Sequence, residues 1–213
     1  MAYIRLLILI ASLSTLSGAF ATPKPLGALF SARALLADLV AQDTSVGHAA
    51  IPAMAATLAA RFIAAGFACE DVSVIPQGET AALVVRYRGD GSGGRPIDFL
   101  AHLDVVVAKA EDWGRNPFVL AEENGYFIGR GTLDVKGEIA LLITTFISLK
   151  AEGFRPTRDL ILVLTGDEET SGASAEDLVA HHRDLVDAEF ALNADNLGGG
   201  LLAEGDGRPL LFR

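Results

Sequence analysis

The sequence is poor in cysteine, and Cys69 is the only one among its 213 residues. A single cysteine cannot form an intramolecular disulfide, which excludes a small disulfide-stapled scaffold. It also excludes a zinc site built from several thiolates, so any bound metal must be held by His, Asp and Glu. Cys69 follows the apolar run 62–67 and has no nearby histidine that would activate a thiol. We therefore expect a small core residue at this position.

Positive charge is scarce as well, with 17 Lys and Arg against 27 Asp and Glu and a formal net charge of -10. This balance argues against nucleic acid and against an anionic membrane surface as partners. Hydrophobic residues make up 51% and charged residues 21%, a composition typical of a globular chain rather than a disordered one. No internal repeat or low-complexity tract divides the sequence, and its length suits one domain.

The apolar run near the N-terminus is too short and too interrupted for a comfortable membrane span. Arg5 precedes the run 6–16, and Ala19-Phe20-Ala21 matches the small-x-small pattern of a cleavage site. We predict a signal peptide over 1–21 and a mature domain over 22–213. The protein is then exported, to the periplasm or beyond, with no membrane contact after cleavage. A retained N-terminal anchor is the alternative.

The mature sequence alternates between helix-like and strand-like segments. Helical spacing of apolar residues predicts helices over 26–40, 53–65, 138–150 and 173–182. Alternating or continuous apolar runs predict strands over 72–74, 80–87, 97–107, 126–128, 159–164 and 188–193. The Gly-rich stretch 88–95 is a loop and not a phosphate cradle, because no helix follows it. This alternation predicts an α/β sandwich with a mostly parallel sheet.

Acidic and imidazole side chains follow the predicted buried strands. His102 and Asp104 end one strand, Asp167, Glu168 and Glu169 follow another, Asp195 follows a third, and Asp134 precedes a helix. Ligand sites in open α/β sheets form at the carboxyl ends of strands. So many like charges in one partly dry cleft would repel one another, and a divalent cation or a pair of cations relieves that repulsion.

The residue types suit zinc, which His and carboxylate groups bind while leaving room for a water molecule. His102 and Asp104 point the same way on a strand, and a carboxylate commonly orients a metal-bound imidazole. Glu168 and Glu169 are adjacent, so one can bind metal while the other acts as a base. The alternative is that these acids are solvated loop residues or helix N-caps, which suits Asp134 and Glu169 because each precedes a helix.

The motifs resemble a known family. Its members are acetylornithine deacetylase, succinyl-diaminopimelate desuccinylase, aminoacylase and carboxypeptidase (peptidase family M-twenty). The resemblance rests, in chain order, on Ala101-His102-Leu103-Asp104-Val105-Val106, Trp113, Pro117-Phe118, Gly129-Arg130-Gly131-Thr132-Leu133-Asp134-Val135-Lys136-Gly137, Thr165-Gly166-Asp167-Glu168-Glu169 and Asn193-Ala194-Asp195. It runs from about Leu26 to the end of the chain. The implied fold is the three-layer sandwich of zinc exopeptidases, of which 22–213 would be the N-terminal part of the catalytic domain.

The resemblance also implies roles for single residues. His102 and Asp195 would bind the first zinc, Asp134 would bridge both zinc ions, and Glu169 would bind the second. Asp104 would orient His102, and Glu168 would be the general base. Some members of the family ligate through a Glu at the place of Asn196, but an amide is a poor metal ligand and favours Asp195. Cobalt or manganese could replace zinc at such a mixed site.

The implied activity is hydrolysis of amide bonds in small peptides or N-acyl amino acids, of the carboxypeptidase or dipeptidase type. Zinc lowers the pKa of a shared water, and Glu168 takes its proton and passes it to the leaving amine. Export favours peptide hydrolysis, and an N-acyl amino acid deacylase is the alternative.

The family has a lid and dimerisation domain and a final His ligand that we do not find before Arg213. Without the lid domain we expect no homodimer and an incomplete second metal site. A different class of function follows as an alternative, an inactive metal-binding or partner-pairing module. The other histidines, His48, His181 and His182, suit surface or helix-end positions.

Overall fold

The computed structural model describes residues 27–195, 202–204 and 208–210. The predicted signal peptide, and with it the retained anchor as its alternative, lies outside these residues. No helix in the described part of the chain is long and apolar enough to cross a membrane.

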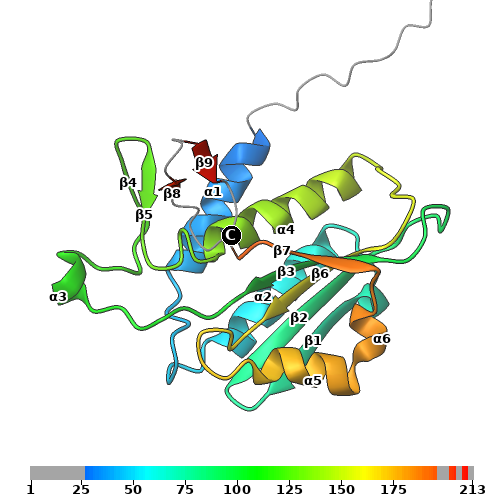
Figure 1. Ribbon diagram of the computed structural model, residues 1–213, viewed down its shortest axis with the longest axis horizontal. Helices are drawn as coiled ribbons and strands as arrows, with labels where there is room; N and C mark the ends of the chain where they lie inside the picture. Colours follow the sequence, from blue (N-terminus) through cyan, green and yellow to red (C-terminus); the bar gives the residue numbers. More distant parts are fainter. Residues whose placement is uncertain (1–26, 196–201, 205–207, 211–213) are drawn as a thin grey trace, which may run out of the picture.

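A mixed sheet forms the centre of the molecule (Figure 1), and its strands lie in the order β1-β2-β6-β3-β7. Their bounds are Val72–Gln77 for β1, Thr80–Tyr87 for β2, Leu160–Thr165 for β6, Ile97–His102 for β3 and Phe190–Asn193 for β7. Strand β3 runs parallel to both β6 and β7, whereas β2 is antiparallel to both β1 and β6. Every strand of this sheet except β2 therefore points the same way, which confirms the mostly parallel sheet.

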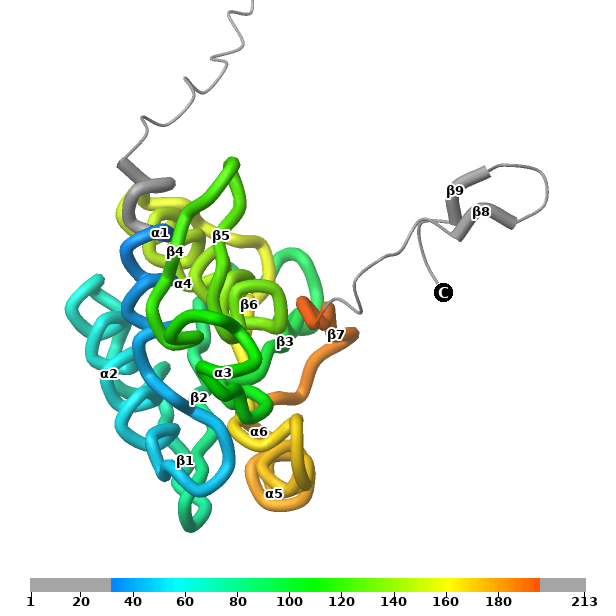
Figure 2. The backbone as a smooth tube through the Cα atoms, turned by 90° about the vertical axis from the view of Figure 1, so that its left-hand side faces the viewer, coloured from blue at the N-terminus to red at the C-terminus, as the bar shows by residue number. Residues whose placement is uncertain are grey.

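Helices cover both faces of the sheet, which confirms the three-layer sandwich (Figure 2). One face carries α1 (Gly27–Val40), α2 (Ile51–Ala64) and α4 (Lys136–Ala151), and the other carries α5 (Ala173–His181) and α6 (Arg183–Val186). Apolar residues on alternate positions of the inner strands β2 and β6 contribute to two separate cores. Leu83 and Leu162 belong to the core under α2 and α4, whereas Val84 and Val163 belong to the core under α5.

The short elements are those that the sequence pattern missed. These are α3 (Ala110–Trp113), the hairpin partner β4 (Ala121–Glu123) of the correctly predicted β5 (Tyr126–Ile128), α6, and β8 (Leu202–Glu204). Strand β8 pairs antiparallel with β9 (Arg208–Leu210), which overlaps a strand that the sequence predicts over 209–212. The predicted strand over 97–107 is too long. Strand β3 ends at His102, and the chain then leaves the sheet although Leu103 and Val105 are buried.

The prediction that Cys69 is a core residue is wrong. Cys69 is exposed and begins a 3-10 turn, Cys69–Asp71. The apolar run ends instead at Phe67, whose ring packs edge-on against Phe62 and Tyr87 with centroids 5.1 and 5.4 Å away. Because Phe67 already fills this part of the core, the next residues turn outward.

One carboxylate in the sheet is buried without a complete set of partners. Asp98 on β3 is 5% exposed, and within the described residues its Oδ1 accepts no hydrogen bond. Burial raises the pKa of Asp98 to about 6, although the charge of Arg86 opposes this. The folded protein therefore favours the neutral form of Asp98 at a pH where the unfolded chain is already ionised.

We predict that Asp98→Asn stabilises the protein at pH 8 by about 2 kcal/mol, because the folded state no longer has to hold a buried charge. The folded pKa lies above the unfolded one, so the penalty is absent below about pH 4, grows up to about pH 6 and is constant above it. Urea unfolding of both proteins from pH 4 to 8 measures this. A stability difference that does not change with pH would contradict the assignment.

Candidate metal centre

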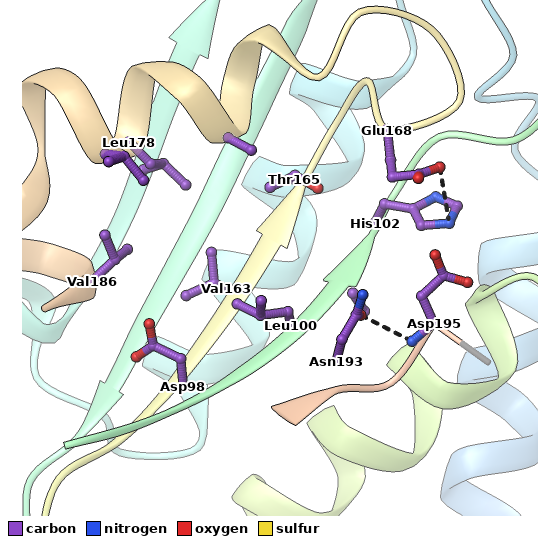
Figure 3. A pocket seen from close by; sticks show the side chains of 13 residues that line it. Asp98, Leu100, His102, Val163, Thr165, Glu168, Leu178, Val186, Asn193 and Asp195 are labelled. Carbon is purple, nitrogen blue, oxygen red and sulfur yellow. Dashed lines mark hydrogen bonds and ion pairs between the residues drawn. The ribbon is translucent and has the colours of Figure 1, made fainter. Parts of the chain in front are cut away.

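The carboxyl ends of the parallel strands bring the predicted site residues to one edge of the sheet. His102 is the last residue of β3 and lies beside Thr165, the last residue of β6. After β7, the Ala194 N–H donates to the carbonyl of Leu100 at 2.9 Å, which holds the start of the Asp195 turn against β3. Figure 3 shows the side chains of His102, Glu168 and Asp195 turned toward one another at this edge.

His102 is the centre of the cluster and is 1% exposed. Its Nδ1 lies 3.0 Å from the carbonyl oxygen of Asp104 and 3.4 Å from Asp104 Oδ1. A carbonyl only accepts, so Nδ1 carries the proton and donates. The other nitrogen, Nε2, faces the carboxylates, 3.1 Å from Asp134 Oδ1 and 3.9 Å from Glu168 Oε2. In the neutral imidazole, the lone pair of Nε2 therefore points into the acidic cluster, as a metal ligand requires.

The charges around the ring hold a proton on it when no cation is present. Burial lowers the pKa of His102, but the hydrogen bonds and charge of Asp104, with a further contribution from the charge of Asp134, outweigh burial and raise the pKa to about 9. A proton thus occupies, near neutral pH, the place that a cation would take. A metal ion must displace this proton in order to bind Nε2.

The buried carboxylate of Asp104 fixes the turn that carries the two glutamates. Its Oδ1 accepts the N–H of Glu168 at 3.1 Å, and its Oδ2 accepts the N–H of Glu169 at 2.9 Å. The residue that was predicted to orient His102 thus contacts the ring and also holds the Glu168-Glu169 backbone. The second contact was not expected from the sequence.

Asp167 belongs to the same acidic run but turns away from the cluster. Its carboxylate accepts the N–H groups of Ala173 and Ser174 at 2.9 and 3.0 Å and the hydroxyls of Ser171 and Ser174. Burial raises the pKa of Asp167, but these hydrogen bonds outweigh it and leave the pKa lowered. Asp167 is therefore an anchor for the start of α5, which follows directly after the glutamate turn.

The remaining acids meet at His102 in two groups. One contains Asp134 and Asp195 and the other contains Glu168 and Glu169, and in each group the ligand atoms lie within 4.8 Å of one another. The alternative that Asp134 and Glu169 are helix caps is wrong, because the N-cap positions of α4 and α5 are Val135 and Gly172. All predicted ligands and the predicted base are thus brought together, with Asp104 behind them.

Two charged residues near this cluster were missed in the sequence. Glu138 lies on the first turn of α4, and its Oε2 is buried without a hydrogen-bond partner in the described structure. Burial raises the pKa of Glu138, and the charges of Asp134 and Asp195 raise it further. Lys136 is completely buried, and burial lowers its pKa to about 8 against the opposing charges of Asp43 and Asp104.

The donor set fits a divalent cation. Burial raises the pKa of Glu169, and the charge of Asp134 raises it further although His102 opposes this. Carboxylates that raise one another's pKa are destabilised together when ionised, and a cation between them reverses that effect. An imidazole with its lone pair among several carboxylates is the mixed N and O donor set that zinc, cobalt and manganese accept.

The other histidines stay outside the cluster. His48 lies 3.3 Å from Asp43, and His181 and His182 lie 2.8 and 3.7 Å from Asp177. Neither group of potential metal ligands found among the described residues includes any of them.

A cavity of about 300 Å³ begins at His102, Glu168 and Asp195 and extends along one face of the sheet (Figure 3). Its far end is lined by Asp98, and β3, β6, α5 and α6 supply its apolar walls, Leu100, Val163, Leu178 and Val186. The acidic cluster thus borders a largely apolar cavity.

The sequence around this site is similar to that of known hydrolases. Residues 99–206 match the model of peptidase family M20/M25/M40. A succinyl-diaminopimelate desuccinylase of Methylocella silvestris is 35% identical over 130 residues, which cover 59% of this chain and 33% of that protein. The N-fatty-acyl-amino acid synthase/hydrolase PM20D1 of Xenopus tropicalis is 42% identical over 77 residues, which cover 36% of this chain and 15% of that protein.

Among solved structures, human carnosine dipeptidase 1 superposes with a TM-score of 0.65 at 23% identity, covering 84% of this chain and 43% of that one. At this identity the likeness shows the fold alone. The chain spans about a third of the length of the desuccinylases that it matches.

We predict that Asp104→Asn destabilises the folded protein by about 2 kcal/mol, because an amide can accept only one of the two backbone N–H groups that the carboxylate now accepts. Urea unfolding measures the change. Asp112→Asn on the exposed surface of α3 is the matched control, and we expect it to stay within about 0.5 kcal/mol of the unaltered protein. Equal stability of the two variants would show that the Asp104 contacts do not hold the turn.

Proposed function

The chain belongs to peptidase family M20/M25/M40, and on this premise we propose that it supplies the metal-binding site of a hydrolase that cleaves amide bonds. The observation that carries the proposal is the position of His102 Nε2 among four carboxylate side chains, each of which follows a strand or precedes a helix. The carboxylates around this buried imidazole attract a cation. A metal ion that replaces the proton on Nε2 would bind the neutral form of the ring, which is the form that acts as a ligand.

We assign His102 and Asp195 to one zinc ion, Asp134 to a bridging position and Glu169 to a second ion. His102, Asp134 and Asp195 form one group of possible ligand atoms within 4.8 Å of one another, which supports their assignment. Glu169 belongs to the second such group, which also contains His102 and Glu168. Zinc is favoured by the mixed imidazole and carboxylate donors, and cobalt or manganese would also be accepted.

Glu168 is the proposed general base. Its side chain is half exposed, so a substrate and a water molecule can reach it, and the backbone contact to Asp104 fixes its position. Bound zinc would polarise the substrate carbonyl and lower the pKa of water. Glu168 would accept the proton of the attacking water on a carboxylate oxygen and pass it to the nitrogen of the leaving amine.

The substrate class is proposed as small peptides or N-acyl amino acids. A peptidase role follows from the family, whereas the names of the matched desuccinylase and N-fatty-acyl-amino acid synthase/hydrolase favour the second candidate, a deacylase of N-acyl amino acids. The apolar cavity beside the cluster suits an acyl chain or an apolar side chain.

The test combines zinc content with hydrolysis of dipeptides and of N-acyl amino acids. We expect Glu168→Gln to keep its zinc but to lose at least about 100-fold in kcat, because the proton acceptor is gone. Glu169→Ala should lose the second zinc ion, and Glu176→Gln on the exposed side of α5 should retain its zinc and its activity.

Each outcome separates the candidates. Zinc binding without hydrolysis of either substrate class would favour the inactive metal-binding module over the hydrolase. A protein that binds no zinc, cobalt or manganese would overturn the assignment of the centre.

We also propose export, on the basis of the signal-like residues 1–21. Mass spectrometry of the protein recovered from outside the cytoplasm should find Thr22 as its first residue. Recovery of the uncleaved chain from the membrane fraction would favour the N-terminal anchor instead.

A further inference from the structure

Lys136 is a buried cation with no role in the proposed chemistry. It begins α4, two residues after Asp134, and its side chain is 0% exposed. Lysine is almost never fully buried unless its ammonium is paired, because removing the charge from water is costly. This desolvation cost arises next to a cluster that is proposed to bind another cation. The contacts that matter are therefore those that the ammonium makes and a neutral side chain could not make.

The ammonium binds the end of a distant helix. Lys136 Nζ donates to the carbonyl oxygen of Leu39 at 2.9 Å and to that of Gln42 at 2.7 Å. Helix α1 ends at Val40, so the Leu39 carbonyl lies in its last turn, where the helix carries a partial negative charge. Gln42 lies just past the helix, and its backbone N–H donates to the same Leu39 carbonyl at 3.3 Å. The contact joins chain segments that are more than 90 residues apart in the sequence.

Lys136 also closes the loop that carries Asp134, through its backbone and through the aliphatic part of its side chain. The backbone N–H of Lys136 donates to the carbonyl of Gly131 at 2.7 Å. Gly131 has a φ of +84°, and a Cβ at this position would lie 2.8 Å from Lys136 Cδ. The aliphatic part of Lys136 therefore rests directly on Gly131, and a larger residue there would displace it. The ends of the loop 131–136 are thereby fixed to each other as well as to α1.

The segment after α1 also holds the other side of the cluster. Thr44 Oγ1 donates to the carbonyl of Leu103 at 2.8 Å, between His102 and Asp104. The stretch 39–44 thus contacts the Asp134 loop through Lys136 and the His102 strand end through Thr44. Asp134 Oδ1 and His102 Nε2, which lie 3.1 Å apart, belong to loops that are both attached to the same short stretch.

We propose that Lys136 is a positioning residue that sets Asp134 opposite His102 by anchoring the 131–136 loop to the carbonyl groups at the end of α1. The inference deepens the proposed metal centre and rests on it. Lys136 is not one of the proposed metal ligands, and its effect passes through the backbone of the loop. Its positive charge by itself opposes a second cation nearby, so its contribution to metal binding is geometric.

The charge of Lys136 and its positioning role have opposite effects on zinc affinity, so the direction in which the affinity changes in a Lys136 variant distinguishes the two. In Lys136→Met the chain length is kept, whereas the charge and both hydrogen bonds are lost. Electrostatics alone predicts that zinc binds more tightly, because a positive charge has been removed. Loss of positioning predicts weaker binding by about 10-fold or more, the usual effect of removing a group that orients metal ligands. Titration calorimetry with zinc measures the affinity of the folded variant.

Lys150→Met is the matched control, because Lys150 lies in the last turn of the same helix and its ammonium lies over the rings of Phe67 and Tyr87, 5.2 and 5.5 Å from their centroids. The Lys150→Met variant also loses one positive charge, but at the opposite end of α4 from Lys136. We therefore expect its zinc affinity to be unchanged. The absorption spectrum of bound cobalt gives a second readout, which should change in Lys136→Met and stay the same in Lys150→Met.

A metal-free measurement separates this proposal from the metal centre itself. In the absence of metal, amide hydrogen exchange of residues 130–137 should become faster in Lys136→Met, while exchange of β3 and β6 stays slow. Unchanged exchange of the loop, or zinc affinity that is equal or higher, would overturn the role of Lys136. Faster exchange in a protein whose unaltered form binds no metal would instead overturn the proposed function and leave Lys136 as an anchor of the loop only.

Discussion

The carboxylate of Asp104 is the contact on which the candidate site depends. It is buried, it contacts the imidazole of His102, and it accepts the backbone N–H groups of Glu168 and Glu169. These groups come from the ends of two parallel strands, β3 and β6, so one charged side chain sets the distance between two loops. A charged acceptor makes stronger hydrogen bonds than a neutral one, and burial prevents water from competing with them.

The other loops are attached by different means. The Asp167 carboxylate, next to the Glu168-Glu169 turn, accepts backbone N–H groups at the start of α5. The Lys136 ammonium, next to the Asp134 loop, donates to backbone carbonyls at and just past the end of α1. The Glu168-Glu169 turn and the Asp134 loop thus each have a neighbouring charged residue that points away from the site and fixes the backbone. By fixing the backbone, these two residues oppose the repulsion between the carboxylates of the cluster.

The sequence predicted much of the fold and of the cluster, because strand periodicity and the position of acids at strand ends are local signals. His102, Asp134 and Glu169 could be found in this way. Lys136 could not, because a lysine at the start of a helix reads as a surface residue unless its long-range partners are known. Cys69 was misplaced for a related reason: whether an apolar run ends one or two residues earlier depends on the space that Phe67 takes in the core.

Strand β7 has a consequence for any ion that Asp195 holds. It is the last strand of the sheet, it pairs only with β3 among the described strands, and all four of its residues are exposed. A strand that is hydrogen-bonded on one side frays more readily than an inner strand. Asp195 can then act as a ligand only in the fraction of molecules in which β7 is docked, and the apparent affinity for the ion is reduced by that fraction. Whatever pairs with the outer edge of β7 would tighten ion binding without touching the ion.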